Sequence, residues 1–245
     1  VSWSMVNLGD KLHKAADVLA AKSSFDLYKG LTSHWNFPEE VVIGGKEPLT
    51  AVTDPKRRPQ LTNNIEQMMA LDTISYLPGD ILTKVDRAAM GVSLETRVPF
   101  LNHKVVEFAW SLPLEFKLRN GIGKWCLKEV LYKYVPKSLI ERPKMGFGVP
   151  IDSWLRGPLK GWANDLLSED RLVEEGIFRP KPIRKMWLEH QSGKRNWQDQ
   201  LWNVLMFQSW YEKNKWIYLN RVNDSCCHYR HIIGSCFTVI PNLYH

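Results

Sequence analysis

The sequence contains no long apolar run. None of its hydrophobic stretches approaches the ~20 residues that a membrane-spanning helix needs. The first residues also lack the order of a signal peptide, in which basic residues precede an apolar stretch. We therefore expect a soluble, cytoplasmic protein that has no membrane partner.

Cysteine is scarce and irregularly placed. There are four cysteines in 245 residues, and three of them fall in the last twenty. No regular disulfide framework and no CxxC pair is present, and adjacent Cys226 and Cys227 do not have a familiar zinc spacing to His231. We predict no metal site in this tail. Because helical periodicity is lost there, we interpret residues 216–245 as a divergent extension, either disordered or foreign.

The charges do not form runs of one sign. The net charge is +7 at pH 7, and the basic residues are spread along the chain. This mild excess favours a phosphate-bearing partner without identifying one. Residues 152–214 interleave tryptophan with arginine and lysine, but the aromatic residues keep helical spacing, which favours core packing over base stacking. We predict no nucleic-acid binding.

With 44% hydrophobic residues the chain can bury a substantial core in one or two domains. Apolar residues at helical spacing predict helices from Asn64, over 103–112, over 124–135 and over much of 152–214. Four prolines predict a loop over 35–62.

One stretch combines charge with apolar periodicity: YLPGDILTKVDRAAMGVSLETRVPFLNH, residues 76–103. Pro78 and Gly79 predict that it opens a short amphipathic helix, and Pro99 ends it. Its charged residues include Asp80, Asp86, Glu95 and Arg97. A plain surface helix with its charges in water is one explanation, and a functional site is the other.

Two lysines follow glycine-containing turns. The turn from Asn120 to Gly123 brings Lys124 to the start of the next helix. Lys144 lies at the centre of ERPKMGFGVPI, a segment whose prolines and glycines exclude regular structure. A cation in such a constrained loop suits anion binding, because little entropy is lost when the anion arrives. A surface lysine in a turn remains the alternative.

Three motifs, the stretch 76–103, NGIGKWCLKEVL and RPKMGFGVPIDSWLRGPL, together resemble the C-terminal synthetase region of glutamine-hydrolysing asparagine synthetases. The resemblance implies that residues 1–215 are a mainly α-helical fragment of an α/β synthetase domain. That domain has the adenine-nucleotide α-hydrolase-like fold of the ATP-pyrophosphatases. The SGGxDS and GDGGDE-like motifs of the family are not in this sequence, and Asn102 stands where relatives usually have Asp.

The resemblance also implies a reaction. Such enzymes adenylate the aspartate side chain with ATP and Mg²⁺, and ammonia from a glutaminase domain, which is absent here, displaces AMP. It assigns catalytic roles to Lys144 and Asp80 and phosphate binding to Lys124 and Lys144. Asp86, Glu95 and Arg97 would hold the loop before Pro99 in shape, with Arg97 paired to a carboxylate.

Two alternatives stay open at this point. A related synthetase could amidate another carboxylate, such as a sugar acid of surface-polysaccharide synthesis. A non-catalytic basic helical module that binds a phosphate-rich partner belongs to a different class. The isolated fragment is expected to be inactive, and a homodimer is one assembly that the sequence allows.

Overall fold

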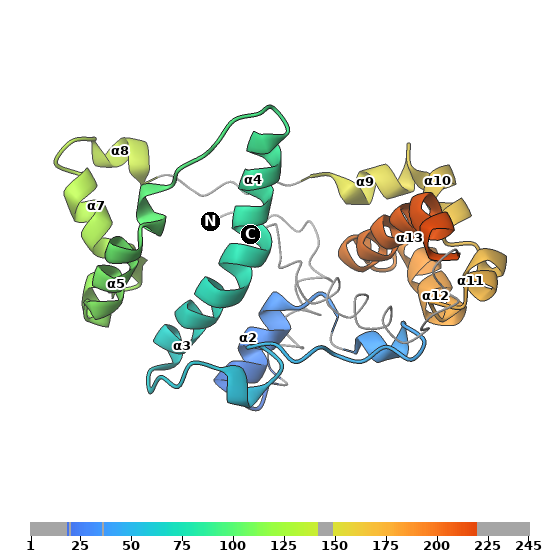
Figure 1. Cartoon of the computed structure of the whole chain (residues 1–245), viewed down its shortest axis with the longest axis horizontal. Helices are drawn as coiled ribbons and strands as arrows, with labels where there is room; N and C mark the ends of the chain where they lie inside the picture. The colour runs from blue at the N-terminus through green and yellow to red at the C-terminus, as the bar shows by residue number, and fades with distance from the viewer. Residues whose placement is uncertain (1–18, 20, 36, 142–148, 220–245) are drawn as a thin grey trace.

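The computed structural model describes residues 19, 21–35, 37–141 and 149–219. In these residues the chain is mainly helical, as predicted, and its regular β structure is one two-stranded hairpin. Three groups of helices lie next to one another, joined by extended segments (Figure 1). Within the described part of the chain, no helix is both long enough and apolar enough to cross a bilayer.

The middle group consists of α2 (Ser24–Thr32) beside one long helical segment, which runs through α3 (Asn64–Leu71), η3 (Asp72–Leu82) and α4 (Thr83–Met90). Side chains cap the starts of both. Ser23 accepts a hydrogen bond from the Asp26 backbone N–H, and Asn63 accepts from those of Ile65 and Glu66. The predicted helix from Asn64 is confirmed.

Pro78 does not open a helix, so that prediction is wrong. It lies inside η3, which is wound as a π-helix. A proline inside an α-helix removes one hydrogen bond and its ring clashes with the carbonyl four residues earlier. The wider π turn changes which residues pair and gives the ring room. The Thr83 hydroxyl donates to the Pro78 carbonyl at 2.9 Å, so that carbonyl has a partner.

A second group follows Pro99 and contains the hairpin. The Asn120–Gly121 turn of the hairpin has φ values of +51° and +76°, as a two-residue hairpin turn with Asn-Gly requires. The elements of this group are η4 (Pro99–Leu101), α5 (His103–Ser111), α6 (Leu114–Lys117), β1 (Leu118–Arg119), β2 (Ile122–Gly123), α7 (Trp125–Leu131) and α8 (Lys137–Ile140).

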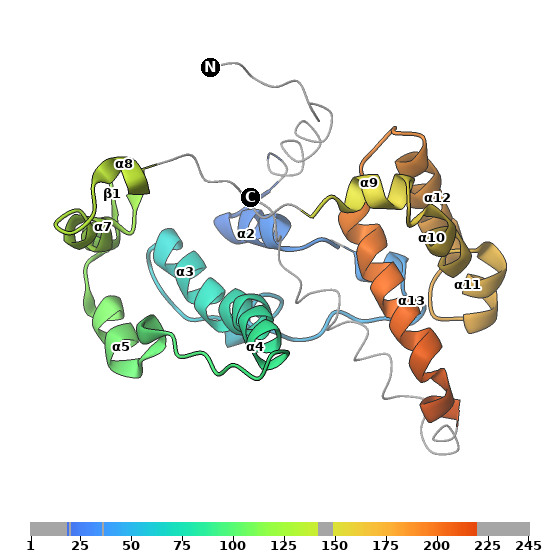
Figure 2. The same cartoon turned by 90° about the horizontal axis from the view of Figure 1, so that it is seen from above.

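The third group holds the main hydrophobic core. Its helices are α9 (Ile151–Arg156), α10 (Lys160–Leu166), α11 (Glu169–Glu175), α12 (Pro180–Gln191) and α13 (Gln198–Leu219). Leu155, Ile183 and Leu205, from α9, α12 and α13, have no exposed surface. Figure 2 shows α13 alongside α10, α11 and α12. The predicted core packing of the aromatic residues is confirmed for most of the tryptophans of this segment, whereas Trp154 and Trp210 are exposed.

The loop between α2 and α3 reaches this third group. It carries two short 3-10 turns, η1 (Pro38–Glu40) and η2 (Pro55–Arg57). The Arg179 backbone N–H donates to the Val41 carbonyl at 2.8 Å. Trp35, Val41 and Val42 are buried within the core of the helical group. A segment predicted to be only a loop therefore supplies part of the hydrophobic core.

The predicted domain boundary at residue 215 falls inside α13, whose backbone is described to Leu219. Residues 220–245 lie outside the described residues. The assignment of the tail as disordered or foreign therefore stays a prediction.

Candidate functional site

Asp80 lies near the end of η3 and is almost completely buried, with 4% of its surface exposed. Its partner is Lys84, one helical turn further on. The Lys84 Nζ lies 2.7 Å from Asp80 Oδ2 and 2.5 Å from Oδ1, so the ammonium contacts both oxygens. Spacing of four residues places two side chains on the same helical face, and a buried carboxylate needs such a cation.

Tyr76 lies close to this carboxylate. Burial raises the pKa of Tyr76, and the negative charges of Asp80 and Asp72 raise it further, so the phenol stays protonated. With the Lys84 ammonium against both of its oxygens, the buried Asp80 carboxylate holds that cation in place. It is not arranged as a free base.

The remaining charges predicted in this stretch are on the surface. Asp86 is exposed on α4. Arg97 Nη2 lies 2.6 Å from Glu95 Oε1, and both side chains are at least 70% exposed. Arg97 therefore contacts a carboxylate, but an ion pair this exposed contributes little to stability. That this pair shapes the loop before Pro99 stays a prediction.

Lys124 directly precedes α7, as predicted. Its backbone is left-handed, with φ of +58°, and it caps the helix. Its side chain is exposed and makes no hydrogen bond or ion pair with the described residues. It lies on the second group of helices, away from the middle group that carries Asp80 in both views (Figures 1 and 2).

Lys144 lies outside the described residues, so its place relative to Asp80 and Lys124 stays a prediction. The described acidic side chains also do not fit a Mg²⁺ site. The Asp80 carboxylate is paired with Lys84 through both of its oxygens, and no cluster of three or more potential metal-binding side chains occurs in the described ranges.

Asn102 has a clear structural task. Its side chain accepts a hydrogen bond from the Lys104 backbone N–H at 3.0 Å and caps α5. Asn and Asp cap helices about equally well. The replacement of the acidic residue expected here therefore preserves the start of α5.

Sequence reasoning missed Lys84 and Tyr76 as neighbours of Asp80. The signal for Lys84 was available, because an acidic residue four positions before a lysine on a helix predicts an ion pair. Tyr76 stands four positions before Asp80, so the same spacing also places it on that face of the helix.

Comparison with known families identifies the class of protein. The asparagine synthase family model matches residues 3–212, which is most of the chain. The chain therefore belongs to the asparagine synthase family. No solved structure matches the chain.

Individual relatives agree with this assignment. The chain is 32% identical over 152 residues to asparagine synthetase [glutamine-hydrolyzing] 1 of Bacillus subtilis, which covers 62% of the chain and 24% of that protein. It is 35% identical over 148 residues to a putative asparagine synthetase [glutamine-hydrolyzing] of Mycobacterium tuberculosis, covering 60% and 22%. The human asparagine synthetase [glutamine-hydrolyzing] is 29% identical over 138 residues, covering 50% and 24%. The matched part is thus about a quarter of each relative's length.

Proposed function

We propose that this chain contributes to an ATP-dependent ligase that converts the aspartate side-chain carboxylate into an amide. In the first step a carboxylate oxygen attacks the α-phosphorus of ATP, and the bond to pyrophosphate breaks. In the second step the ammonia nitrogen attacks the acyl carbon, the bond to AMP breaks, and the nitrogen loses a proton. The family match over residues 3–212 is the observation that carries this proposal.

The lysines would act on the phosphates. Negative charge develops on the α-phosphate and on the departing pyrophosphate, and cations fixed nearby lower the barrier. Lys124 suits this task because its side chain is exposed and makes no ion pair with the described residues. Lys144 is proposed as its counterpart, because the resemblance assigns it to the phosphates as well.

In this proposal Asp80 positions another charged group. Its carboxylate is buried and holds the Lys84 ammonium, which is 37% exposed and reaches the surface of the middle group. In this proposal Lys84 is a further cation for the intermediate, and Asp80 keeps its charge and direction fixed. This modifies the direct catalytic role that the sequence predicts for Asp80.

The other partners are also proposals. ATP, Mg²⁺, aspartate and ammonia from a glutaminase domain would be needed, together with the nucleotide-binding part of an α/β ATP-pyrophosphatase domain. Mg²⁺ would supply charge neutralisation at the pyrophosphate. A cytoplasmic location follows from the need for ATP and free amino acids.

The test uses a full-length synthetase that carries this chain. Replacement of Lys144 by Ala, or of Lys124 by Ala, is expected to lower aspartate-dependent pyrophosphate release by ~10²-fold, as single-donor losses do elsewhere. Lys133→Ala is the control, because Lys133 is exposed and lies shortly after α7. Pyrophosphate release at the unaltered rate in Lys144→Ala would show that the assignment is wrong.

A further inference from the structure

A cavity lies between α2, the loop after Lys46 and the π-helix η3. Its volume is about 400 Å³, which is in the range of small-molecule sites. Its walls are mostly apolar and include Val52, Ile74 and Pro78. Neither Asp80 nor Lys124 lines it, although Tyr76, the neighbour of Asp80, does.

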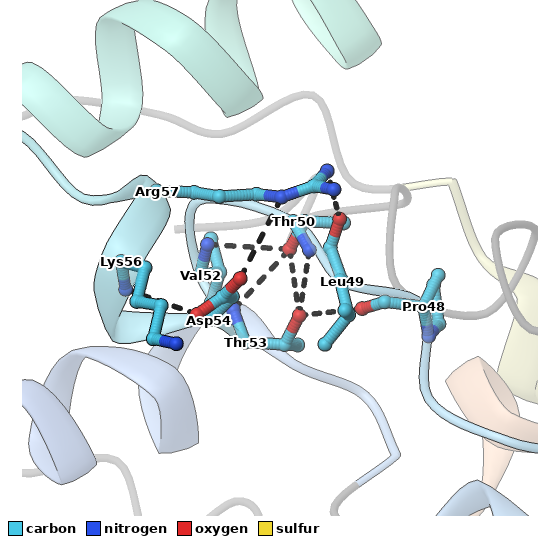
Figure 3. Close-up of polar contacts among 8 residues, drawn as sticks. All are labelled: Pro48, Leu49, Thr50, Val52, Thr53, Asp54, Lys56 and Arg57. Atoms are coloured by element: carbon cyan, nitrogen blue, oxygen red, sulfur yellow. Dashed lines mark hydrogen bonds and ion pairs between the residues drawn. The ribbon is translucent and has the colours of Figure 1, made fainter.

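The loop that closes one side of the cavity is held in shape by its own hydrogen bonds (Figure 3). The Thr53 hydroxyl donates to the Pro48 carbonyl at 2.5 Å and accepts from the Thr50 backbone N–H at 2.8 Å. Arg57 Nη1 donates to the Leu49 carbonyl at 2.6 Å. A wall fixed in this way loses little entropy when a ligand binds.

Several hydroxyl groups that line the cavity already donate to the backbone. Thr32 donates to the Tyr28 carbonyl at 2.9 Å, Ser33 to that of Trp35 at 2.7 Å, and Ser75 to that of Leu71 at 2.6 Å. The charged side chains of the lining are Lys29 and Glu47, and they are the strongest polar groups for recognising a ligand.

Lys29 and Glu47 come from opposite sides, α2 and the loop, and both are half-buried. Neither side chain makes a hydrogen bond or ion pair within the described residues. Burial raises the pKa of the Glu47 carboxyl, as does Glu39, and Lys29 offsets this only partly. A half-buried carboxylate that accepts no hydrogen bond is strongly stabilised by a cation placed against it.

A ligand with one charge would satisfy only one of these two groups. A zwitterion would satisfy both, and its apolar part would lie against the apolar walls. We propose that this cavity binds a free α-amino acid with an apolar side chain, its ammonium facing Glu47 and its carboxylate facing Lys29. This second site does not depend on the proposed amide synthesis.

The test is calorimetric titration of the 245-residue chain with L-leucine and L-phenylalanine. We expect one molecule bound per chain. The singly charged analogues 3-methylbutylamine and 4-methylpentanoate should bind at least about tenfold more weakly, since each leaves one charge unpaired. L-Aspartate should also bind more weakly, because its second carboxylate would meet the apolar wall.

Variants give the decisive comparison. Glu47→Gln should weaken L-leucine binding by about tenfold or more, and Lys29→Met should do the same. Glu40→Gln, an exposed change on the same loop, should leave it unaltered. The absence of binding to a chain whose circular dichroism is helical would overturn the proposal, as would equal affinity in Glu47→Gln. L-Aspartate binding as tightly as L-leucine would overturn the apolar preference.

Discussion

Two regions of the molecule use their apolar residues in opposite ways. In helices α9–α13, Leu155, Ile183 and Leu205 are completely buried. Between residues 81 and 141 no side chain is buried, although this segment is also mainly helical. Phe108 is 64% exposed and Leu139 is 63% exposed.

The difference separates a region with its own core from one without. An amphipathic helix is stabilised mainly by burying its apolar face. Contacts within this chain therefore stabilise the helices of 81–141 less than they stabilise α9–α13. Exposed apolar surface of this extent usually marks a contact with another part or partner. The curated relatives are about four times longer than the part they share with this chain, and they therefore have residues that could cover it.

The largest effect is expected when the same substitution, Leu to Ala, is made in each of the two regions and the losses in the free energy of unfolding are compared. Leu205→Ala should lower the free energy of unfolding by about 2–5 kcal/mol, because it leaves a cavity in a packed core. Leu139→Ala should change it by less than about 0.5 kcal/mol, because that side chain is already in water. Urea unfolding followed by tryptophan fluorescence measures both. Equal losses would show that residues 81–141 have a core of their own.

An intermediate effect is expected at the border between the regions. Asp80 is the last buried residue before the exposed segment, and Lys84→Met would leave its carboxylate without its cation. We expect a loss of about 1–3 kcal/mol, reduced by the partial exposure of Lys84. Hydrogen exchange of the backbone amides from α3 to α4 measures this loss of stability. Lys104→Met, on the surface of α5, is the control. Unchanged exchange rates in Lys84→Met would argue against a structural role for the pair.

The smallest effect is a dependence on pH confined to the packed region. His190 has no exposed surface. Burial lowers its pKa, Arg156 lowers it further, and Asp152 opposes both. Since the unfolded imidazole has a pKa near ~6.5, the unfolded state binds more protons between that value and the lowered one. Stability should therefore fall as the pH drops through this window.

His190→Gln should flatten this slope, and His103→Gln, an exposed change, should not. The comparison concerns the slope and not the absolute stability, because His190 Nδ1 also accepts a hydrogen bond from the Trp197 backbone N–H at 3.2 Å. The urea midpoint of each variant, measured at several pH values across this range, gives the pH dependence of its stability. A slope that persists in His190→Gln would assign the pH dependence to another group.

Local signals in the sequence were read correctly where they act locally. A helix begins at Asn64, as its apolar periodicity predicts, and the Asn120–Gly121 turn forms as its residues require. The signals failed where neighbours decide. Pro78 stays within a helix because the π winding makes room for its ring. Lys144 could not be tested, since it lies outside the described residues.

The sequence by itself determined the family, the mainly helical character and the residues that carry charge near residues 76–103, because motifs, periodicity and caps are properties of neighbouring residues. Only the tertiary structure decided which of those charges are buried. It buried Asp80 and left Glu95 and Arg97 in water. It also buried Val41 and Val42 in a distant core. Burial depends on contacts between distant segments, and no local pattern encodes those contacts.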